Sequence, residues 1–350
     1  MSGRITISID AMGGDDAPQM VVAGLEHFLR SRREARFLLF GDEPALQDLL
    51  RKHHALGQHV DIRHTEAVIA NDEKPTVALR TGRGSSMRKA IDAVASGEAQ
   101  GIVSAGNTGA LMAMAKVVLR TLPGIDRPAI AGLGPTMRGR FVMLDLGANV
   151  ECTADNLVQF ALMGEVFAKR VLRLEEPKVG LLNIGEEHLK GNESVQKAAA
   201  ILQASPLAID FHGFVEGNDI LEGTVDVIVI DGFTGNVALK SMEGAARLYS
   251  RAVREALNSS LLARIGAALA WPALSKVRRR FDPRLYNGAM FLGLNGVCVK
   301  SHGGADAVSF ANAIGAAVDL IADGVNEGIK EDLAHIRPNP DDGLKMVAGS

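Results

Sequence analysis

The chain has 350 residues, of which 47% are hydrophobic and 23% are charged, and these values exclude a wholly disordered chain. Its 38 glycines exceed the usual share of about 7%, whereas Phe, Trp and Tyr together make up only 4%. The formal net charge of −3 gives no global reason to expect nucleic acid as a partner. Many glycines and few aromatics favour tight turns that approach small ligands over surfaces that stack on bases.

The sequence also indicates a reducing compartment. Cys152 and Cys298 are the only two cysteines, too few for a disulfide framework. The first residues lack an apolar stretch of signal-peptide length, and no uncharged run approaches the length of a membrane span. We expect a cytoplasmic protein.

Short apolar segments alternate with glycine-rich turns and helical segments along the whole chain. In chain order we expect a strand at 5–10, a helix at 19–30, strands at 37–40, 60–63 and 101–103, a helix at 111–122, a strand at 141–144, a helix at 156–171, a strand at 179–182, a helix at 193–203, a strand at 225–230, a helix ending near 257, a strand at 297–300 and a last helix ending near 329. This order predicts an α/β fold, a three-layer α/β/α sandwich around a mostly parallel sheet.

The domain organisation follows from the absence of repeats and linkers in the sequence. No fixed-period repeat and no long linker interrupts the alternation, so residues 1–335 are predicted to form a single domain. The segment 336–350 contains Pro338 and Pro340, and we expect it to be a poorly ordered tail.

One segment, 259–281, departs from the alternation and predicts a helical hairpin inserted into the domain. Pro272 is expected to end the first helix, which places Trp271 at the bend. A basic, apolar hairpin suits anionic lipid or an acyl carrier protein, and the alternative is a helix pair packed on the body or on a second subunit. The candidate contact residues are the apolar Leu261, Leu262, Ile265, Leu269 and Trp271 and the basic Lys276, Arg278, Arg279 and Arg280.

Several turns after the expected strands offer backbone N–H groups near helix N-termini, which attract anions. The clearest cases contain Gly13 and Gly14, Asn107 and Thr108, and Asn236. Asn and Thr add neutral donors that suit a phosphate or a developing oxyanion. The alternative for each glycine is a tight turn that needs a positive φ. Because ligands of such sheets sit beyond the carboxyl ends of the strands, we expect these turns to gather at one sheet edge.

Charged residues stand near the same strand ends. Lys190, Lys300 and His302 are candidates for pairing with phosphate or for proton transfer. Asp10, Asp145 and Asp231 each close a strand, and helix capping or turn hydrogen bonds are the expected roles of their carboxylates.

The sequence lacks the common motifs of other chemistries. It contains no P-loop, no GxGxxG and no GxSxG, and Ser104 has no nucleophile-elbow spacing. No cluster of His and carboxylate residues has metal-ligand spacing, so neither a metal nor another cofactor is predicted.

Taken together, the turn sequences closely resemble one family. Blocks of this sequence resemble those of the bacterial phosphate acyltransferase family, PlsX. They are DAMGGDDAP (10–18), SAGNTGA (104–110), LDLGAN (144–149), GLLNIGEEHLKGNE (180–193), FHGFVEGNDI (211–220), DGFTGNVALK (231–240) and LGLNGVCVKSHGGAD (292–306).

The resemblance implies an enzyme that makes acyl phosphate from acyl-[acyl carrier protein] and inorganic phosphate for phospholipid synthesis. It further implies a homodimer with a Rossmann-like α/β/α sandwich, similar to phosphate acetyltransferases and isopropylmalate-type dehydrogenases. The hairpin at 259–281 would mediate peripheral membrane association, and a glycerol-3-phosphate acyltransferase would be the downstream partner.

This chemistry needs little from the protein beyond positioning and electrostatics. Phosphate is largely a dianion near neutral pH, and a thiol with a pKa near about 8.5 leaves without strong acid help. Our hypothesis is that Gly13, Gly14, Asn107, Thr108 and Asn236 hold phosphate and oxyanion. Lys190 and Lys300 would offset charge, and His302 would orient phosphate or protonate the leaving thiolate. Two alternatives remain at this point, a dehydrogenase with a shared sandwich and a non-enzymatic scaffold at the membrane surface.

Overall fold

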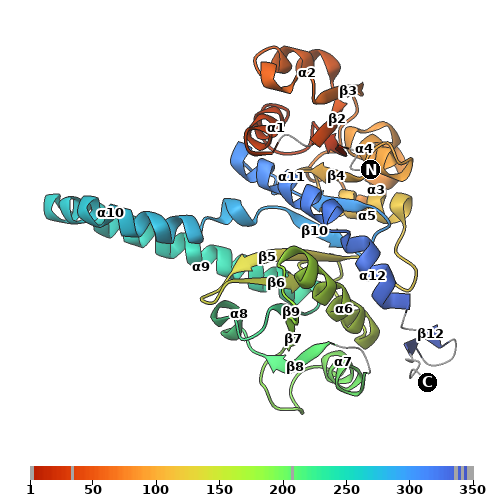
Figure 1. Cartoon of the computed structure of the whole chain (residues 1–350), viewed down its shortest axis with the longest axis vertical. Helices are drawn as coiled ribbons and strands as arrows, with labels where there is room; N and C mark the ends of the chain where they lie inside the picture. The colour runs from red at the N-terminus through yellow and green to blue at the C-terminus, as the bar shows by residue number, and fades with distance from the viewer. Residues whose placement is uncertain (1–3, 33–34, 206–208, 335–337, 340–342, 345–350) are drawn as a thin grey trace.

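The computed structural model describes residues 4–32, 35–205, 209–334, 338–339 and 343–344. Its main feature is a single 11-stranded sheet, with strand order β3-β2-β1-β4-β11-β10-β5-β6-β9-β7-β8 (Figure 1). The strands are β1 (Ile5–Asp10), β2 (Ala35–Gly41), β3 (Val60–His64), β4 (Gly101–Ser104), β5 (Ala129–Pro135), β6 (Arg140–Leu144), β7 (Lys178–Leu182), β8 (Asp210–Val215), β9 (Val227–Val229), β10 (Ala289–Leu292) and β11 (Val297–Lys300).

Helices cover both faces of this sheet, because successive strand residues point to opposite faces and both faces are apolar. In β2, Phe37 and Leu39 pack into one hydrophobic cluster, and Leu38 and Phe40 pack into a second. The hydrophobic cluster that contains Phe37 and Leu39 is completed by α1 (Gln19–Ser31), α6 (Ala154–Val171), α7 (Glu193–Ala204), α11 (Ala307–Ala322) and α12 (Val325–Ala334). The hydrophobic cluster that contains Leu38 and Phe40 is completed by α3 (Pro75–Thr81), α4 (Ser86–Ala95), α5 (Thr108–Leu119), α8 (Asp219–Glu222) and α9 (Gly232–Asn258). A short helix, α2 (Glu43–Leu50), follows β2.

The sheet is mixed, and its two halves run in opposite directions. Strands β3, β2, β1, β4 and β11 are parallel to one another, and so are β6, β9, β7 and β8. Between the halves, β10 is antiparallel to both β11 and β5, and β5 is also antiparallel to β6. The predicted mostly parallel sheet is thus found within each half. The prediction that all the turns gather at one sheet edge is wrong, since the carboxyl ends of the two halves point opposite ways.

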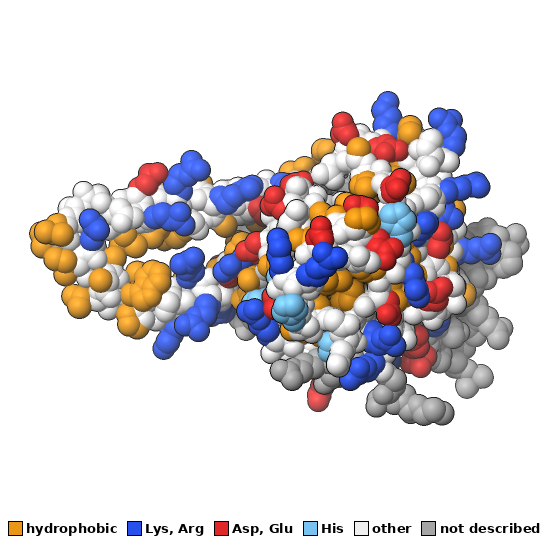
Figure 2. Space-filling model, turned by 90° about the horizontal axis from the view of Figure 1, so that it is seen from above, with side chains coloured by type: hydrophobic (Ala, Val, Ile, Leu, Met, Phe, Trp, Pro, Cys, Tyr) orange, Lys and Arg blue, Asp and Glu red, His pale blue; other side chains and the backbone are white. Residues whose placement is uncertain are grey.

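The hairpin differs from its predicted form. Its two helices are α9 and α10 (Leu261–Arg280), and the turn lies at Ser259 and Ser260. Pro272 lies inside α10 and does not end it, so Trp271 is in mid-helix and not at the bend. The turn at 259–260 is favoured because the Ser260 hydroxyl accepts the Ala263 N–H at 3.1 Å as an N-cap. The hairpin projects far from the body of the molecule (Figures 1 and 2).

The last predicted helix is in fact two, α11 and α12, divided at Gly324, whose φ of +61° favours glycine. Within the described part of the chain, no single helix is long and apolar enough to cross a membrane; the bent pair α11–α12 passes that test by length and composition alone. Most of the predicted tail at 336–350 lies outside the described residues, and Pro338–Asn339 (β12) pairs with Gly343–Leu344 (β13).

Candidate active site

The turns after β1, β4 and β11 meet around the buried carboxylate of Asp10, and we call this group the first cluster. Asp10 accepts hydrogen bonds from the Ser86 hydroxyl at 2.6 Å and from the Ser104 hydroxyl at 2.7 Å. Burial raises the pKa of Asp10, and the two serine hydrogen bonds partly oppose that shift. Asp10 thus fastens β1 to β4 and to the start of α4, as a turn-organising carboxylate would.

Lys300, at the end of β11, is the buried cation of the first cluster. Its ammonium group donates hydrogen bonds to the carbonyl oxygens of Ala105, at 3.3 Å, and Ser301. Burial lowers the pKa of Lys300 to about 8, although the negative charges of Asp10 and Asp15 favour the protonated form. A desolvated ammonium group attracts an anion more strongly than one in water does.

Gly13 and Gly14 form the floor of the first cluster. A Cβ on residue 13 would lie 2.7 Å from the amide nitrogen of Gly106, a distance that real Cβ atoms do not reach. Gly14 has a φ of +116°, which other residues rarely adopt. The turn after β1 therefore packs so closely against the turn after β4 that no side chain fits at Gly13.

The side chain of Asn107 is already engaged by the protein. Its oxygen accepts the Ala110 N–H at 3.0 Å and caps α5, while its amide group donates to the carbonyl oxygens of Ala70, Asn71 and Glu73. Thr108 is exposed in the first turn of the same helix. Phosphate binding by these two residues stays a prediction, and the geometry favours the backbone N–H groups of the turn over the Asn107 amide.

His302 lies on the exposed side of the first cluster. Its Nδ1 accepts the Gly304 N–H at 3.1 Å, and its backbone N–H donates to Asn287 at 3.0 Å. Because Nδ1 acts as an acceptor, the neutral ring carries its proton on Nε2. That proton is available to a ligand.

A second cluster forms where β6 and β9 end. The Asp145 carboxylate is fully buried and accepts backbone N–H groups from Ile130 at 2.9 Å, Ala148 at 3.0 Å and Asn149 at 2.6 Å. Burial raises the pKa of Asp145, and these N–H groups oppose the shift. All the partners belong to its own turn or to β5, so Asp145 holds the turn together.

The start of α9 completes the second cluster. Asp231 caps this helix by accepting the Thr234 N–H and hydroxyl, both at 2.9 Å. Asn236 is exposed one turn later, and a Cβ on Gly147 would lie 3.6 Å from its Cβ. Lys190 is separate: it is exposed after β7, and among the described residues no hydrogen bond or ion pair joins its side chain to either cluster.

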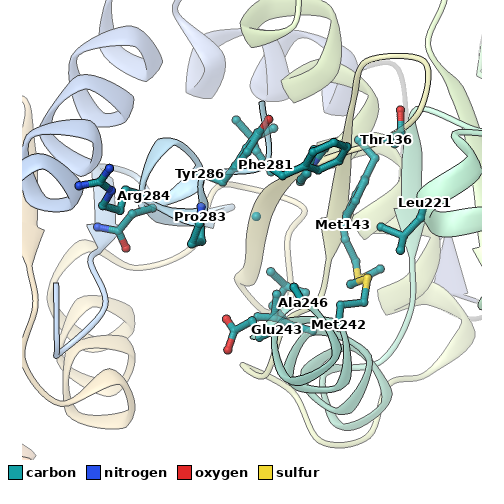
Figure 3. A pocket seen from close by; sticks show the side chains of 18 of the residues that line it. Thr136, Met143, Leu221, Met242, Glu243, Ala246, Phe281, Pro283, Arg284 and Tyr286 are labelled. Atoms are coloured by element: carbon teal, nitrogen blue, oxygen red, sulfur yellow. The ribbon is translucent and has the colours of Figure 1, made fainter. Parts of the chain in front are cut away.

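A cavity of about 730 Å³ lies over β5 and β6, between the two clusters. His302 and Gly304 of the first cluster line one part of it, and Leu146 and Leu239, close to Asp145 and Asn236, line another. The close view shows Arg284, Pro283 and Tyr286 on one side of the cavity and Met143, Leu221 and Met242 on the other (Figure 3). The cavity therefore joins a polar, anion-attracting region to an apolar one.

Sequence reasoning missed several of these residues. Ser86 was not considered and Ser104 was considered only as a nucleophile, because a hydroxyl that donates to a buried carboxylate belongs to no motif. Arg284 was not among the predicted site residues, and it pairs with Asp282 at 2.6 Å and with Asp306 at 3.4 Å. The alternation of charge in Arg284 and Asp282 was the only signal of this pairing.

The described residues contain no group of three or more His, Cys, Asp or Glu placed to hold a metal ion. The fold itself is shared by proteins of different activity. A phosphotransacetylase from Streptococcus pyogenes covers 93% of this chain and 94% of its own length with a TM-score of 0.61 and 18% identity. A 4-hydroxythreonine-4-phosphate dehydrogenase from Klebsiella pneumoniae covers 91% and 98% with a TM-score of 0.51 and 14% identity. The fold alone therefore does not separate the transferase from the dehydrogenase.

Comparisons of sequence do separate them. A family model described as fatty acid synthesis protein matches residues 5–328. A phosphate acyltransferase from Rhodospirillum centenum is 61% identical over 337 residues, which cover 96% of this chain and 95% of that protein. Another from Paramagnetospirillum magneticum is 55% identical over 350 residues and the full length of both. The chain belongs to this fatty acid synthesis protein family, that of the phosphate acyltransferases.

Proposed function

We propose that this phosphate acyltransferase moves an acyl group from the thioester of an acyl carrier protein to inorganic phosphate, giving an acyl phosphate for phospholipid synthesis. The observation that carries the proposal is that His302 lies between a polar region and an apolar cavity. On one side lie the buried Lys300 ammonium and the closely packed turn of Gly13 and Gly14. On the other lies the apolar cavity over β5 and β6.

The reaction proceeds by direct attack. A phosphate oxygen forms a bond to the thioester carbonyl carbon, and the carbonyl electron pair moves to oxygen. Collapse of this tetrahedral intermediate breaks the C–S bond and releases the thiolate, which accepts a hydrogen bond from Nε2–H of His302 and takes the proton that hydrogen phosphate loses on becoming acyl phosphate. Lys300, mostly protonated below its pKa of about 8, offsets phosphate charge, while backbone N–H groups at Gly13 and Gly14 bind phosphate oxygens.

The first test is the dependence of product on phosphate. The purified chain should convert acyl carrier thioester to acyl phosphate only when inorganic phosphate is present, detected by trapping with hydroxylamine. Thioester hydrolysis at the same rate without phosphate would refute the transferase. Titration with NADH tests the dehydrogenase alternative, because a dehydrogenase would bind NADH.

Lys190 is the predicted site residue with the least support from the geometry, so its variant is informative. Lys190→Met should lower turnover by more than about tenfold if the loop after β7 closes over phosphate. Lys197→Met is the matched control, because Lys197 is an exposed lysine of the following helix that pairs with Glu193. Turnover of Lys190→Met within about twofold of wild type would remove Lys190 from the site.

We propose further that the enzyme is cytoplasmic and rests on the membrane surface through the α9–α10 hairpin. Leu261, Leu262 and Leu269 are 73%, 81% and 80% exposed, although each is strongly apolar. Basic side chains flank them along the hairpin (Figure 2). Apolar residues that enter the interface beside basic residues that meet anionic headgroups form a membrane-surface helix.

Vesicle flotation tests this second proposal. Leu262→Asp should reduce recovery with phosphatidylglycerol vesicles, and Val117→Asp, an exposed apolar residue of α5, should not. Equal recovery of both variants would refute the assignment.

We also propose a homodimer, as the resemblance implies. Leu248 and Tyr249 of α9 are 71% and 73% exposed and supply apolar surface for a second copy. Light scattering measures the mass of the particle directly, and a monomer at micromolar concentration would refute the homodimer.

A glycerol-3-phosphate acyltransferase is the expected consumer of the acyl phosphate, and pull-down with that enzyme tests whether the two proteins bind each other.

A further inference from the structure

The cavity over β5 and β6 is far larger than the phosphate site requires. Its volume of about 730 Å³ lies in the upper part of the range of about 300–1,000 Å³ that small-molecule sites occupy. Most of its lining is apolar, including Phe141, Met143, Leu146, Leu221 and Met242. Phosphate and the thioester carbonyl are polar, so contact with such an apolar surface does not stabilise them.

Two of the charged side chains along the cavity, Glu243 and Arg284, are already paired. Glu243 accepts a hydrogen bond from Lys240 at 2.9 Å, and Arg284 binds Asp282 at 2.6 Å. These charges are therefore largely neutralised before a ligand arrives, and the apolar remainder of the wall favours an uncharged, flexible occupant.

The cavity is also polarised along its length. Arg284 and Tyr286 stand on one side, whereas Leu221, Met143 and Met242 stand on the other (Figure 3). The polar side connects to the first cluster, since Asn287 binds the His302 N–H at 3.0 Å and Arg284 reaches Asp306 at 3.4 Å.

We propose that this cavity holds the hydrocarbon chain of the acyl donor and sets the chain length that the enzyme accepts, an inference that rests on the proposed function. The thioester carbonyl lies at His302 and Gly304, where phosphate attacks it. The chain runs over β5 and β6, past Ala246 of α9, and its methyl end lies between Met143, Leu221 and Met242. The two methionines are flexible and adapt their shape to the end of the chain.

Chain length is the variable that tests this assignment. Binding of acyl amide analogues of the carrier's pantetheine arm, which cannot react, should tighten by about fourfold per added methylene. The gain should stop once the methyl end reaches Leu221. Affinity that is independent of chain length in the wild type would refute the assignment.

Filling the cavity at two depths gives a sharper result. Ala246→Trp on α9 should lower kcat/KM for a 16-carbon donor by more than about tenfold, and leave a 6-carbon donor within about twofold. Leu221→Trp, at the apolar end, should spare longer donors than Ala246→Trp does. Ala246 and Leu221 are both exposed to solvent, so their variants should fold, and equal melting temperatures would verify this.

Ala245→Trp is the matched control, because Ala245 is the exposed neighbour of Ala246 on α9 and does not line the cavity. It should behave as wild type at every chain length. An equal loss for short and long donors in Ala246→Trp would refute the inference, and so would a change of oligomeric mass confined to that variant, since a second copy would then occupy the cavity. Failure of wild type to make acyl phosphate from any donor would instead refute the proposed function.

Discussion

Replacement of Lys300 by Met tests two separate effects of this buried cation, one on the free energy of unfolding and one on activity with phosphate. Lys300 has a pKa of about 8 in the folded protein against an ordinary 10.5, because burial disfavours its charge. Between these values the unfolded chain binds more protons than the folded protein, so the stability contributed by Lys300 rises with pH. From pH 7 to pH 9.5 the free energy of unfolding should rise by about 2 kcal/mol more in wild type than in Lys300→Met.

The variant also leaves the carbonyl oxygens of Ala105 and Ser301 without their donor. That loss is the same at both pH values, so it cancels in the comparison. Urea unfolding followed by circular dichroism at pH 7 and pH 9.5 measures the difference. An equal change in the free energy of unfolding for the two proteins would refute the lowered pKa of Lys300.

Activity should move in the opposite direction to stability. The protonated fraction of Lys300 falls by about tenfold from pH 7 to pH 9, and kcat/KM for phosphate should fall with it in wild type. Lys300→Met should be slow at both pH values and lack this fall. A wild-type rate that stays level to pH 9 would show that the charge of Lys300 does not act on phosphate.

Three further substitutions test other parts of the site. Gly13→Ala places a Cβ against Asp10 and 2.7 Å from the Gly106 nitrogen, so kcat/KM for phosphate should drop by more than about tenfold, and an unchanged value would show that this turn is not the anion site. Asp145→Ala leaves at least three backbone N–H groups without an acceptor and should lower the free energy of unfolding by about 3–5 kcal/mol in urea; a loss below about 1 kcal/mol would contradict the turn-holding role. Arg280→Ala removes hydrogen bonds to the carbonyl oxygens of Thr136 and Met137, at 2.9 and 2.7 Å, so amide exchange at the hairpin base should accelerate, while unchanged exchange would show that other contacts hold it.

Much of the fold was predictable because the strand, glycine turn and helix pattern is local. Strand β1 has the predicted bounds, and β2, β6 and β7 differ by a residue or two. Strands β5, β8 and β10 were missed. Neither β5 nor β10 opens onto a glycine-rich turn and a helix, and these two reverse the direction of half the sheet. The grouping of Lys300 with Gly13 followed from parallel strands, but the division from Asp145 depended on long-range pairing that no local pattern records.

The cavity was beyond prediction for the same reason. Its lining comes from β5, β6, α8, α9 and the segment after α10, which approach one another only in the folded chain. The hairpin was predicted by composition, yet its turn was misplaced because Pro272 outweighed the cap at Ser260. An exposed helix tolerates an internal proline more readily than a buried one, since water satisfies the freed carbonyl.

The base of the hairpin is attached to residues that line the cavity, so a movement of the hairpin is transmitted to the cavity. Arg280 ties the end of α10 to the carbonyl oxygens of Thr136 and Met137, and those two residues and Phe281 line the cavity. A 20-residue helix such as α10 is about 30 Å long, so a tilt of a few degrees at its base moves its tip by about 2–3 Å. Conversely, a load applied at the tip reaches the base as torque on the wall of the cavity. Whatever holds the tip therefore acts mechanically on the shape of the cavity.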